Sequence, residues 1–260
     1  MPMKYFLYIA LSLAFFIACQ EFKKEEFNEE DLHQSSDTIE VELISPTKSQ
    51  FDTTFSGIRI HSMDVFDEPS NEIVEFIEDK SEESRIAIEL KKERGLNVFY
   101  SVNNDEVINY SSKSPIPLLG GNNVLLMFAT NAKGISIKNK KAVYLKNHFL
   151  GEGNANFDNS SPHLLYHLPK ESTIKIIEEG LLLDFIVVNA ELHKNAYSVE
   201  VFLDEITFSL SAWQAYRIDG LAEGEHRIKI RLIDKEGNWV PGPFNDSGYR
   251  RFEIRNNSNV

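Results

Sequence analysis

The sequence predicts an all-β protein, and two observations support this prediction. First, apolar residues alternate with polar ones in short runs, which is the period of a strand with one buried face. The clearest runs hold Ile86, Ile88 and Leu90, then Val98, Tyr100 and Val102, then Val199, Val201 and Leu203. Second, turn residues follow two of these runs directly, at 103–105 and 204–205. We therefore expect antiparallel hairpins.

Further elements follow from the same pattern. An early strand is predicted by the alternation of Ile39, Val41 and Leu43. Residues 107–110 are expected to form the second strand of the hairpin whose turn lies at 103–105. The stretch Ser70 to Glu83 fits a short helix and an excursion between strands equally well. The run Leu181 to Ala190 is apolar apart from one acid, which predicts a strand buried on both faces. Later strands are expected at 206–210, 228–232 and 250–254.

An internal repeat divides the chain. Residues 121–134 align without a gap on residues 224–237, because the glycines at both ends shift by the same amount (121 + 103 = 224 and 134 + 103 = 237). About 100 residues with several short strands per copy is typical of an immunoglobulin-like sandwich. We therefore predict two tandem immunoglobulin-like β-sandwiches at 38–150 and 162–256. The Gly-, Asn- and Ser-rich segment 151–161 is the expected linker.

The N-terminus predicts a lipoprotein signal peptide at residues 1–18. Lys4 precedes an apolar run from Tyr5 to Ala18, and the run ends at Cys19, the only cysteine. A membrane-spanning helix is disfavoured because such a helix needs about 20 apolar residues. An ordinary secretory signal remains the alternative. The expected location is the cell envelope, with a lipid anchor at Cys19 in the outer membrane.

Residues 19–37 hold the lipidated cysteine and an acidic tether. From Gln20 to Asp37 the segment carries seven acids against Lys23 and Lys24, and its few apolar residues cannot offset the entropy of ordering. An acidic stretch behind the cysteine also resembles the signal that sends Bacteroidota-type lipoproteins to the outer face of the outer membrane. Both interpretations stay open.

Charge and cysteine content exclude several classes of function. The formal net charge is −13, and removal of residues 1–18, which contain one charged residue (Lys4), gives −14. Nucleic acid is not expected as a partner, because phosphate binding requires clustered Lys and Arg. Once Cys19 carries lipid, no thiol remains for a disulfide, a metal site or a nucleophile.

Catalytic motifs are absent from the sequence, so we expect no enzyme and no cofactor. His163 and His167 are the best metal candidates, but on a strand they lie roughly 13 Å apart, too far to share an ion. No metal site is expected. The paired acids Asp204 and Glu205, and Asp64 and Asp67, are interpreted as turn residues.

Candidate ligand-binding residues lie in the second half of the second module. Arg227, Lys229 and Arg231 alternate along one expected strand, so they share its outer face and could receive an anion. Trp213 and Trp239 could stack on a sugar ring or anchor a protein partner. Core packing is the alternative for the tryptophans, and a solvated face is the alternative for the cations.

A family resemblance rests on several segments of the chain. They are 161–166 with Pro169-Lys170, 181–185, 213–220, 232–238 and the ending Pro241-Gly242-Pro243-Phe244-Asn245. Together they resemble Bacteroidota-type lipoproteins with two immunoglobulin-like modules, a group partly labelled phosphopeptide-binding. Where relatives tend to carry histidines, this chain has Asn97, Phe99 and Ser101.

The resemblance implies the fold more firmly than an activity. The expected function is a non-catalytic envelope or surface lipoprotein that binds a protein, peptide or glycan partner. The alternative is a structural or accessory subunit of an outer-membrane complex without its own ligand site.

Overall fold

A computed structural model describes residues 51–63, 74–82, 84–152, 157–176 and 179–256. The signal peptide, Cys19, the tether, the strand expected at 39–43, and Asp64 and Asp67 lie outside the described residues. Residues 48–260 group into one compact unit. Within the described part of the chain, no helix is long and apolar enough to cross a membrane.

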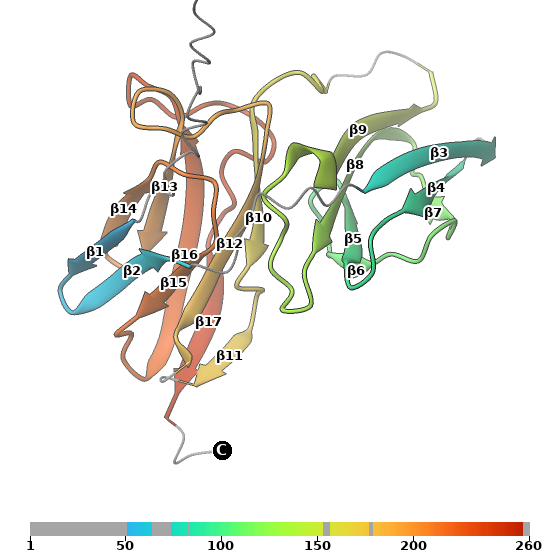
Figure 1. Cartoon of the computed structure of the whole chain (residues 1–260). Helices are drawn as coiled ribbons and strands as arrows, with labels where there is room; N and C mark the ends of the chain where they lie inside the picture. Colours follow the sequence, from blue (N-terminus) through green and yellow to red (C-terminus); the bar gives the residue numbers. More distant parts are fainter. Residues whose placement is uncertain (1–50, 64–73, 83, 153–156, 177–178, 257–260) are drawn as a thin grey trace, which may run out of the picture. The chain divides into compact units, whose positions relative to one another are not determined.

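The chain is nearly all β, as predicted, and it forms two sandwiches (Figure 1). We call "first sandwich" the pair of sheets with strand orders β3-β4-β7 and β6-β5-β8-β9. Its strands are β3 (Glu75–Glu82), β4 (Arg85–Lys91), β5 (Asn97–Val102), β6 (Ile108–Asn109), β7 (Ile116–Pro117), β8 (Gly121–Thr130) and β9 (Val143–Leu150). The 3-10 turn η1 (Lys140–Ala142) precedes β9. The ambiguous stretch 70–83 therefore contains a strand rather than a helix over its described part.

We call "second sandwich" the pair of five-stranded sheets with orders β1-β2-β15-β12-β10 and β11-β17-β16-β13-β14. Its strands are β1 (Asp52–Phe55), β2 (Ile58–Ser62), β10 (His163–Leu168), β11 (Thr173–Ile176), β12 (Leu181–Val188), β13 (Ser198–Leu203), β14 (Ile206–Leu210), β15 (Tyr216–Asp219), β16 (Gly224–Ile233) and β17 (Arg250–Arg255). The named strands pair antiparallel except for β11, which runs parallel to β17. The hairpins expected at 97–110 and 199–210 are present.

The hairpin β1-β2 differs from the expected module boundary. Its residues fall within the range 38–150 assigned to the first module, yet β2 pairs with β15 of the second sandwich. Ile60 pairs with Ile218, and both side chains are fully buried. The approach is close: a Cβ on Gly220, whose φ is +83°, would lie 2.2 Å from the carbonyl oxygen of Gly57. The hairpin thus covers an edge and adds an apolar residue to a distant core, which a local pattern does not reveal. The rest of the division into modules at 38–150 and 162–256 stays a prediction.

The repeat found in the sequence is a repeat of structure. β8 and β16 both start at the first repeated glycine, and all four repeated glycines have positive φ. In the first copy the amides of residues 133 and 135 donate to the side chain of Asn131. In the second copy the amides of residues 236 and 238 donate to Asp234, which is the same pattern shifted by 103 (131 + 103 = 234). The strand and turn at 121–134 therefore recur at 224–237, and the prediction that each sandwich is one copy of the same module remains a prediction.

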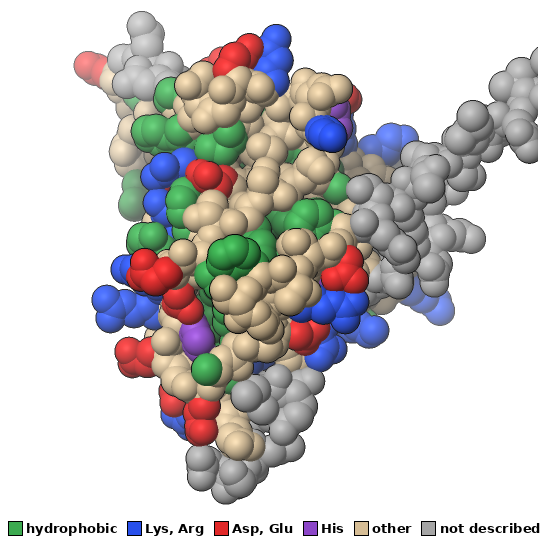
Figure 2. All heavy atoms as spheres, turned by 90° about the vertical axis from the view of Figure 1, so that its left-hand side faces the viewer, with side chains coloured by type: hydrophobic (Ala, Val, Ile, Leu, Met, Phe, Trp, Pro, Cys, Tyr) green, Lys and Arg blue, Asp and Glu red, His purple; other side chains and the backbone are tan. Residues whose placement is uncertain are grey.

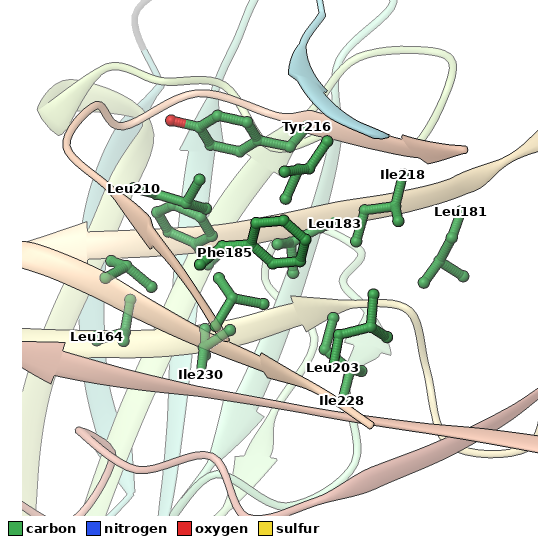
Figure 3. Packing of buried hydrophobic residues seen from close by; sticks show 14 of the residues in the cluster. Leu164, Leu181, Leu183, Phe185, Leu203, Leu210, Tyr216, Ile218, Ile228 and Ile230 are labelled. Carbon is green, nitrogen blue, oxygen red and sulfur yellow. The ribbon is translucent and has the colours of Figure 1, made fainter. Parts of the chain in front are cut away.

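Three apolar clusters hold the fold. One lies between the sheets of the second sandwich, where Phe185 of β12 stacks on Tyr216 of β15 with ring centroids 6.2 Å apart (Figure 3). A second fills the first sandwich around Ile88 and Met127. The third joins the sandwiches through Val124, Leu126 and Phe128 of β8, Leu165 of β10, Ile186 of β12 and Phe244. Strand β12 is therefore buried on both faces, as its apolar run predicts.

Candidate functional site

The repeat makes one outer face of the second sandwich distinctive. At equivalent positions β8 carries Val124, Leu126 and Phe128, whereas β16 carries the candidate residues Arg227, Lys229 and Arg231 (124 + 103 = 227). The apolar set packs against the other sandwich, but the cationic set stays on a free outer face. The core side of β16 is formed by Ile228, Ile230 and Leu232, all fully buried. The predicted orientation of this strand is confirmed.

The three cations alternate with three aromatic rings on this face. Trp239, Arg231, Phe202, Lys229, Tyr249 and Arg227 form, in that order, a continuous series that we call the cation–aromatic ladder. Successive cation-to-ring distances along it are 5.5, 5.4, 4.4, 5.1 and 4.8 Å. Cations within about 6 Å of a ring centroid are attracted to the face of the ring. These contacts favour the observed position of each ring.

Acidic residues pair with each cation of the ladder. Arg231 donates to Asp246 at 2.9 and 2.6 Å, and the Lys229 ammonium lies 3.7 Å from the same carboxylate. Arg227 pairs with Glu205 at 3.1 Å. Burial by itself raises the pKa of Asp246, but the Gly248 amide, Arg231 and Lys229 outweigh burial and lower it. Asp246 is thus ionised at neutral pH, and the positive charge of the face is largely balanced.

Two aromatic rings of the ladder remain open to solvent. Trp239 is 47% exposed and Tyr249 is 45% exposed, whereas Phe202 between them is partly buried. Seen from the side of β1 and β14, Lys and Arg side chains stand between hydrophobic and acidic ones along one margin of the surface (Figure 2). Flat rings, framed by paired charges, form a surface suited to stacking on a ligand.

The ending Pro241-Gly242-Pro243-Phe244-Asn245 positions this loop. The Asn245 side chain is fully buried, accepts from the Leu164 amide at 2.8 Å and donates to the Pro162 carbonyl at 2.9 Å. A Cβ on Gly242 would lie 2.7 Å from the Asn245 amide nitrogen. Asn245 thereby ties the loop between Trp239 and Asp246 to β10. The segment Pro241 to Asn245 therefore has a structural role, because it holds this loop against β10.

Trp213 lies away from the ladder. Its indole nitrogen donates to the Phe185 carbonyl at 3.0 Å, and its ring packs against both the second core and the cluster between the sandwiches. Tyr216, three residues further along the chain, is fully buried. Trp213 is therefore a packing residue, because the neighbouring sandwich covers the face on which it stands. Its sequence context alone could not show this cover.

Phe202 belongs to the ladder and Asp246 pairs with its cations, but neither was among the predicted residues. The outward position of Phe202 could have been predicted from alternation, because its neighbours Val201 and Leu203 point to the core. Tyr249 and Asp246 follow the Pro-Gly-Pro loop, where no period exists to assign a face. Asp246 reaches Arg231 through an isolated antiparallel bridge between the two residues.

The two histidines of β10 are buried and have other partners. His163 stacks on Phe157 at 4.7 Å, and one of its ring nitrogens lies 3.0 Å from the Asp158 carbonyl. His167 Nδ1 lies 2.7 Å from Asp184. Over the described ranges, no group of three or more His, Cys, Asp or Glu side chains is arranged to hold a metal ion.

Asn97, Phe99 and Ser101 all lie on β5. Phe99 stacks on Phe128 at 6.0 Å and belongs to the cluster between the sandwiches. Ser101 is buried and donates to the Asp105 carbonyl at 2.9 Å. Phe99 therefore serves packing, whereas Asn97 is exposed. The turn at Asp204 and Glu205 joins β13 to β14 as predicted, and Asp204 has a φ of +50°.

Comparison with known proteins gives remote structural matches. No protein-family profile matches the chain, and no curated protein sequence matches it. Fibronectin(III)-like modules of Clostridium thermocellum CbhA are similar at 12% identity and a TM-score of 0.31, over 72% of this chain and 97% of that chain. The extracellular domain of a putative one-component system from B. thetaiotaomicron is similar at 9% identity and a TM-score of 0.27, over 80% of this chain and 30% of that chain.

A third similar structure is Bacteroides ovatus SGBP-B of a mixed-linkage glucan utilization locus, in complex with a mixed-linkage heptasaccharide. The identity is 16% and the TM-score 0.20, over 76% of this chain and 47% of that chain. The chain thus spans less than half the length of the last two proteins. The sandwich fold rests on the strand topology, and the lipoprotein and phosphopeptide labels stay predictions.

Proposed function

We propose that the protein is a non-catalytic binding protein of the cell envelope that holds a glycan on the cation–aromatic ladder. The observation that supports this proposal is the pair of half-exposed rings, Trp239 and Tyr249, at fixed positions in one ladder. A rigid ring loses little entropy when a ligand stacks on it, so preorganised rings gain affinity. A sugar ring presents the apolar C–H face that such stacking requires.

The balanced charge of the face favours a neutral ligand. A phosphate on this face would have to compete with Asp246 for Arg231 and Lys229, and with Glu205 for Arg227. A neutral glycan leaves those pairs intact and needs only the rings. The hypothesis that an anion binds here is tested by titrating a phosphopeptide against the wild type and an Arg227→Ala, Arg231→Ala double variant.

Replacing Trp239 with alanine is expected to weaken glycan binding strongly. Loss of one stacked ring removes a large part of the apolar contact, so we expect affinity for a bound polysaccharide to fall by about tenfold or more. Affinity electrophoresis through gels that contain soluble neutral polysaccharides, including mixed-linkage β-glucan, measures the effect. A Phe55→Ala variant is the matched control, because Phe55 is an exposed aromatic residue on β1 rather than on the ladder.

Equal retardation of the Trp239→Ala variant and the wild type would refute the ladder as the glycan site. If no glycan retards the wild type, while a membrane protein complex copurifies with it after crosslinking, the chain is an accessory subunit instead.

Anchorage is a separate part of the proposal. We propose that lipid at Cys19 holds the protein in the outer membrane, because the signal ends at the only cysteine. A Cys19→Ala variant is expected to move from the membrane fraction to the soluble fraction, since two or more acyl chains are needed for stable attachment. Fractionation with a carbonate wash measures this. A variant that stays with the membrane would show that another segment anchors the chain.

A further inference from the structure

A cavity on the seam between the two sandwiches is lined by three lysines. Its volume is about 280 Å³, and Lys133, Lys170 and Lys175 line it together with His167. Lys133 belongs to the turn after β8 in the first sandwich. Lys170 precedes β11 in the second sandwich, and Lys175 lies on that strand. The cationic groups thus come from segments far apart in the sequence. The packing of the two sandwiches brings them to one cavity.

No acidic side chain lines this cavity. Lys175 lies 3.8 Å from Glu179, but no acid within the described ranges pairs with Lys133 or Lys170. The situation differs from the ladder, where every cation has an acidic partner. In a chain with a formal net charge of −13, three lysines around one cavity give a local positive potential. The cavity therefore favours a negatively charged ligand.

The repeat supports a specific role for Lys133. Residue 133 corresponds to Glu236 in the second copy (133 + 103 = 236), and both stand in the same turn with the same hydrogen bonds. The copy whose turn lines the cavity carries a cation, and the other copy carries an exposed acid that lies 3.5 Å from Lys235. The turn itself does not require a lysine at this position, because the second copy forms the same hydrogen bonds with a glutamate there.

His167 and the apolar walls define the rest of the ligand. The His167 side chain is 5% exposed, its Nδ1 is 2.7 Å from the fully buried Asp184, and its ring meets Phe128 edge-on at 4.8 Å. With Nδ1–H donated to Asp184, Nε2 is left to accept from a ligand hydroxyl group. Phe99, Pro169 and Leu182 form apolar walls. The volume equals that of about nine water molecules, which suits one sugar-sized unit.

We propose that this cavity binds a small hydroxylated carboxylate, such as one hexuronate unit. The lysines receive the carboxylate, His167 accepts from a hydroxyl group, and the apolar walls contact the body of the ring. The site is distinct from the cation–aromatic ladder and does not depend on the glycan proposed there.

Isothermal titration of the purified full chain with glucuronate, glucose and inorganic phosphate tests the proposal. We expect saturable binding of glucuronate, none of glucose, and weaker glucuronate binding as salt screens the lysines. A Lys133→Ala, Lys170→Ala double variant is expected to bind glucuronate about tenfold or more weakly. The matched control is a Lys91→Ala, Lys235→Ala double variant, which removes two exposed lysines elsewhere and should bind as the wild type does.

Several results would overturn the proposal. They are the absence of saturable glucuronate binding, equal binding of glucose, and equal glucuronate binding by the cavity variant and the wild type. Binding of phosphate without glucuronate would also overturn it, because the cavity would then recognise charge and not a hydroxylated carboxylate. All four lysines are exposed or partly exposed, so loss of the fold does not confound the comparison.

Discussion

Replacing Asp184 with alanine is expected to lower the free energy of unfolding by about 3–5 kcal/mol, because it leaves a buried cation without its partner. Asp184 is fully buried on β12 of the second sandwich. It accepts from the Ser136 amide at 2.8 Å and from the Ser136 hydroxyl at 3.1 Å, both in the first sandwich. It also binds the Lys138 ammonium, and Lys138 is only 10% exposed. This carboxylate therefore joins the two sandwiches.

Urea unfolding followed by circular dichroism measures the effect of Asp184→Ala. The matched control is Asp52→Ala, which removes an acid from the exposed pair with Arg59, where solvent screens the interaction. We expect little change for that control. An Asp184→Asn variant keeps the shape of the side chain but still leaves Lys138 unpaired, so it should also unfold at lower urea. Wild-type midpoints for both Asp184 variants would contradict the role assigned to this carboxylate.

The same interaction predicts a dependence on pH. Burial by itself raises the pKa of Asp184, but the Lys138 ammonium and His167 outweigh it, so the pKa lies well below its ordinary value. A carboxyl with a lowered pKa stabilises the fold fully above its unfolded pKa of about 3.9, and this contribution is lost as the pH falls further. Other carboxyls, among them Asp246, shift in the same direction. The difference between the wild type and Asp184→Asn should therefore shrink below about pH 4.

Much of the fold was predictable because sheet structure has a local signature. Alternation identified β4, β5, β13 and β16, and the repeat predicted that β8 and β16 would be equivalent. The assignment of 52–62 to the first module failed because pairing between strands far apart in the sequence depends on which edge of a sheet is available. β2 meets β15, whose sequence lies more than 150 residues away. No period in either segment encodes that choice.

The candidate site was predictable only on its regular strand. The common face of Arg227, Lys229 and Arg231 followed from alternation, whereas Tyr249 and Asp246 depend on the loop tied by Asn245. Trp213 was a candidate because nothing in the sequence shows that the first sandwich covers it. The single acid in the apolar run 181–190 was a usable signal. It is Asp184, and a lone acid in a strand buried on both faces must find a partner across an interface.

Replacing Phe244 with alanine is expected to lower the free energy of unfolding by about 3–5 kcal/mol and to separate the unfolding of the two sandwiches. Phe244 is 5% exposed and packs in the cluster shared by β8, β10 and β12. Its ring lies 5.8 Å from Phe157 and 6.2 Å from His163. The outer face of β8 is apolar and packs in the same cluster as the Phe244 ring. Loss of that ring should therefore destabilise the first sandwich more than the second.

Two probes distinguish the sandwiches, because the only tryptophans, Trp213 and Trp239, both lie in the second. Circular dichroism reports on both sandwiches, whereas tryptophan fluorescence reports on the second. In Phe244→Ala we expect the dichroism to change at lower urea than the fluorescence, and limited proteolysis to cut within 151–161 sooner than in the wild type. Phe55→Ala is the control, since Phe55 is 59% exposed. If the transitions of Phe244→Ala coincide and proteolysis leaves one resistant core across both sandwiches, the predicted division into two independently folding modules is wrong, and the shared cluster makes them a single cooperative unit.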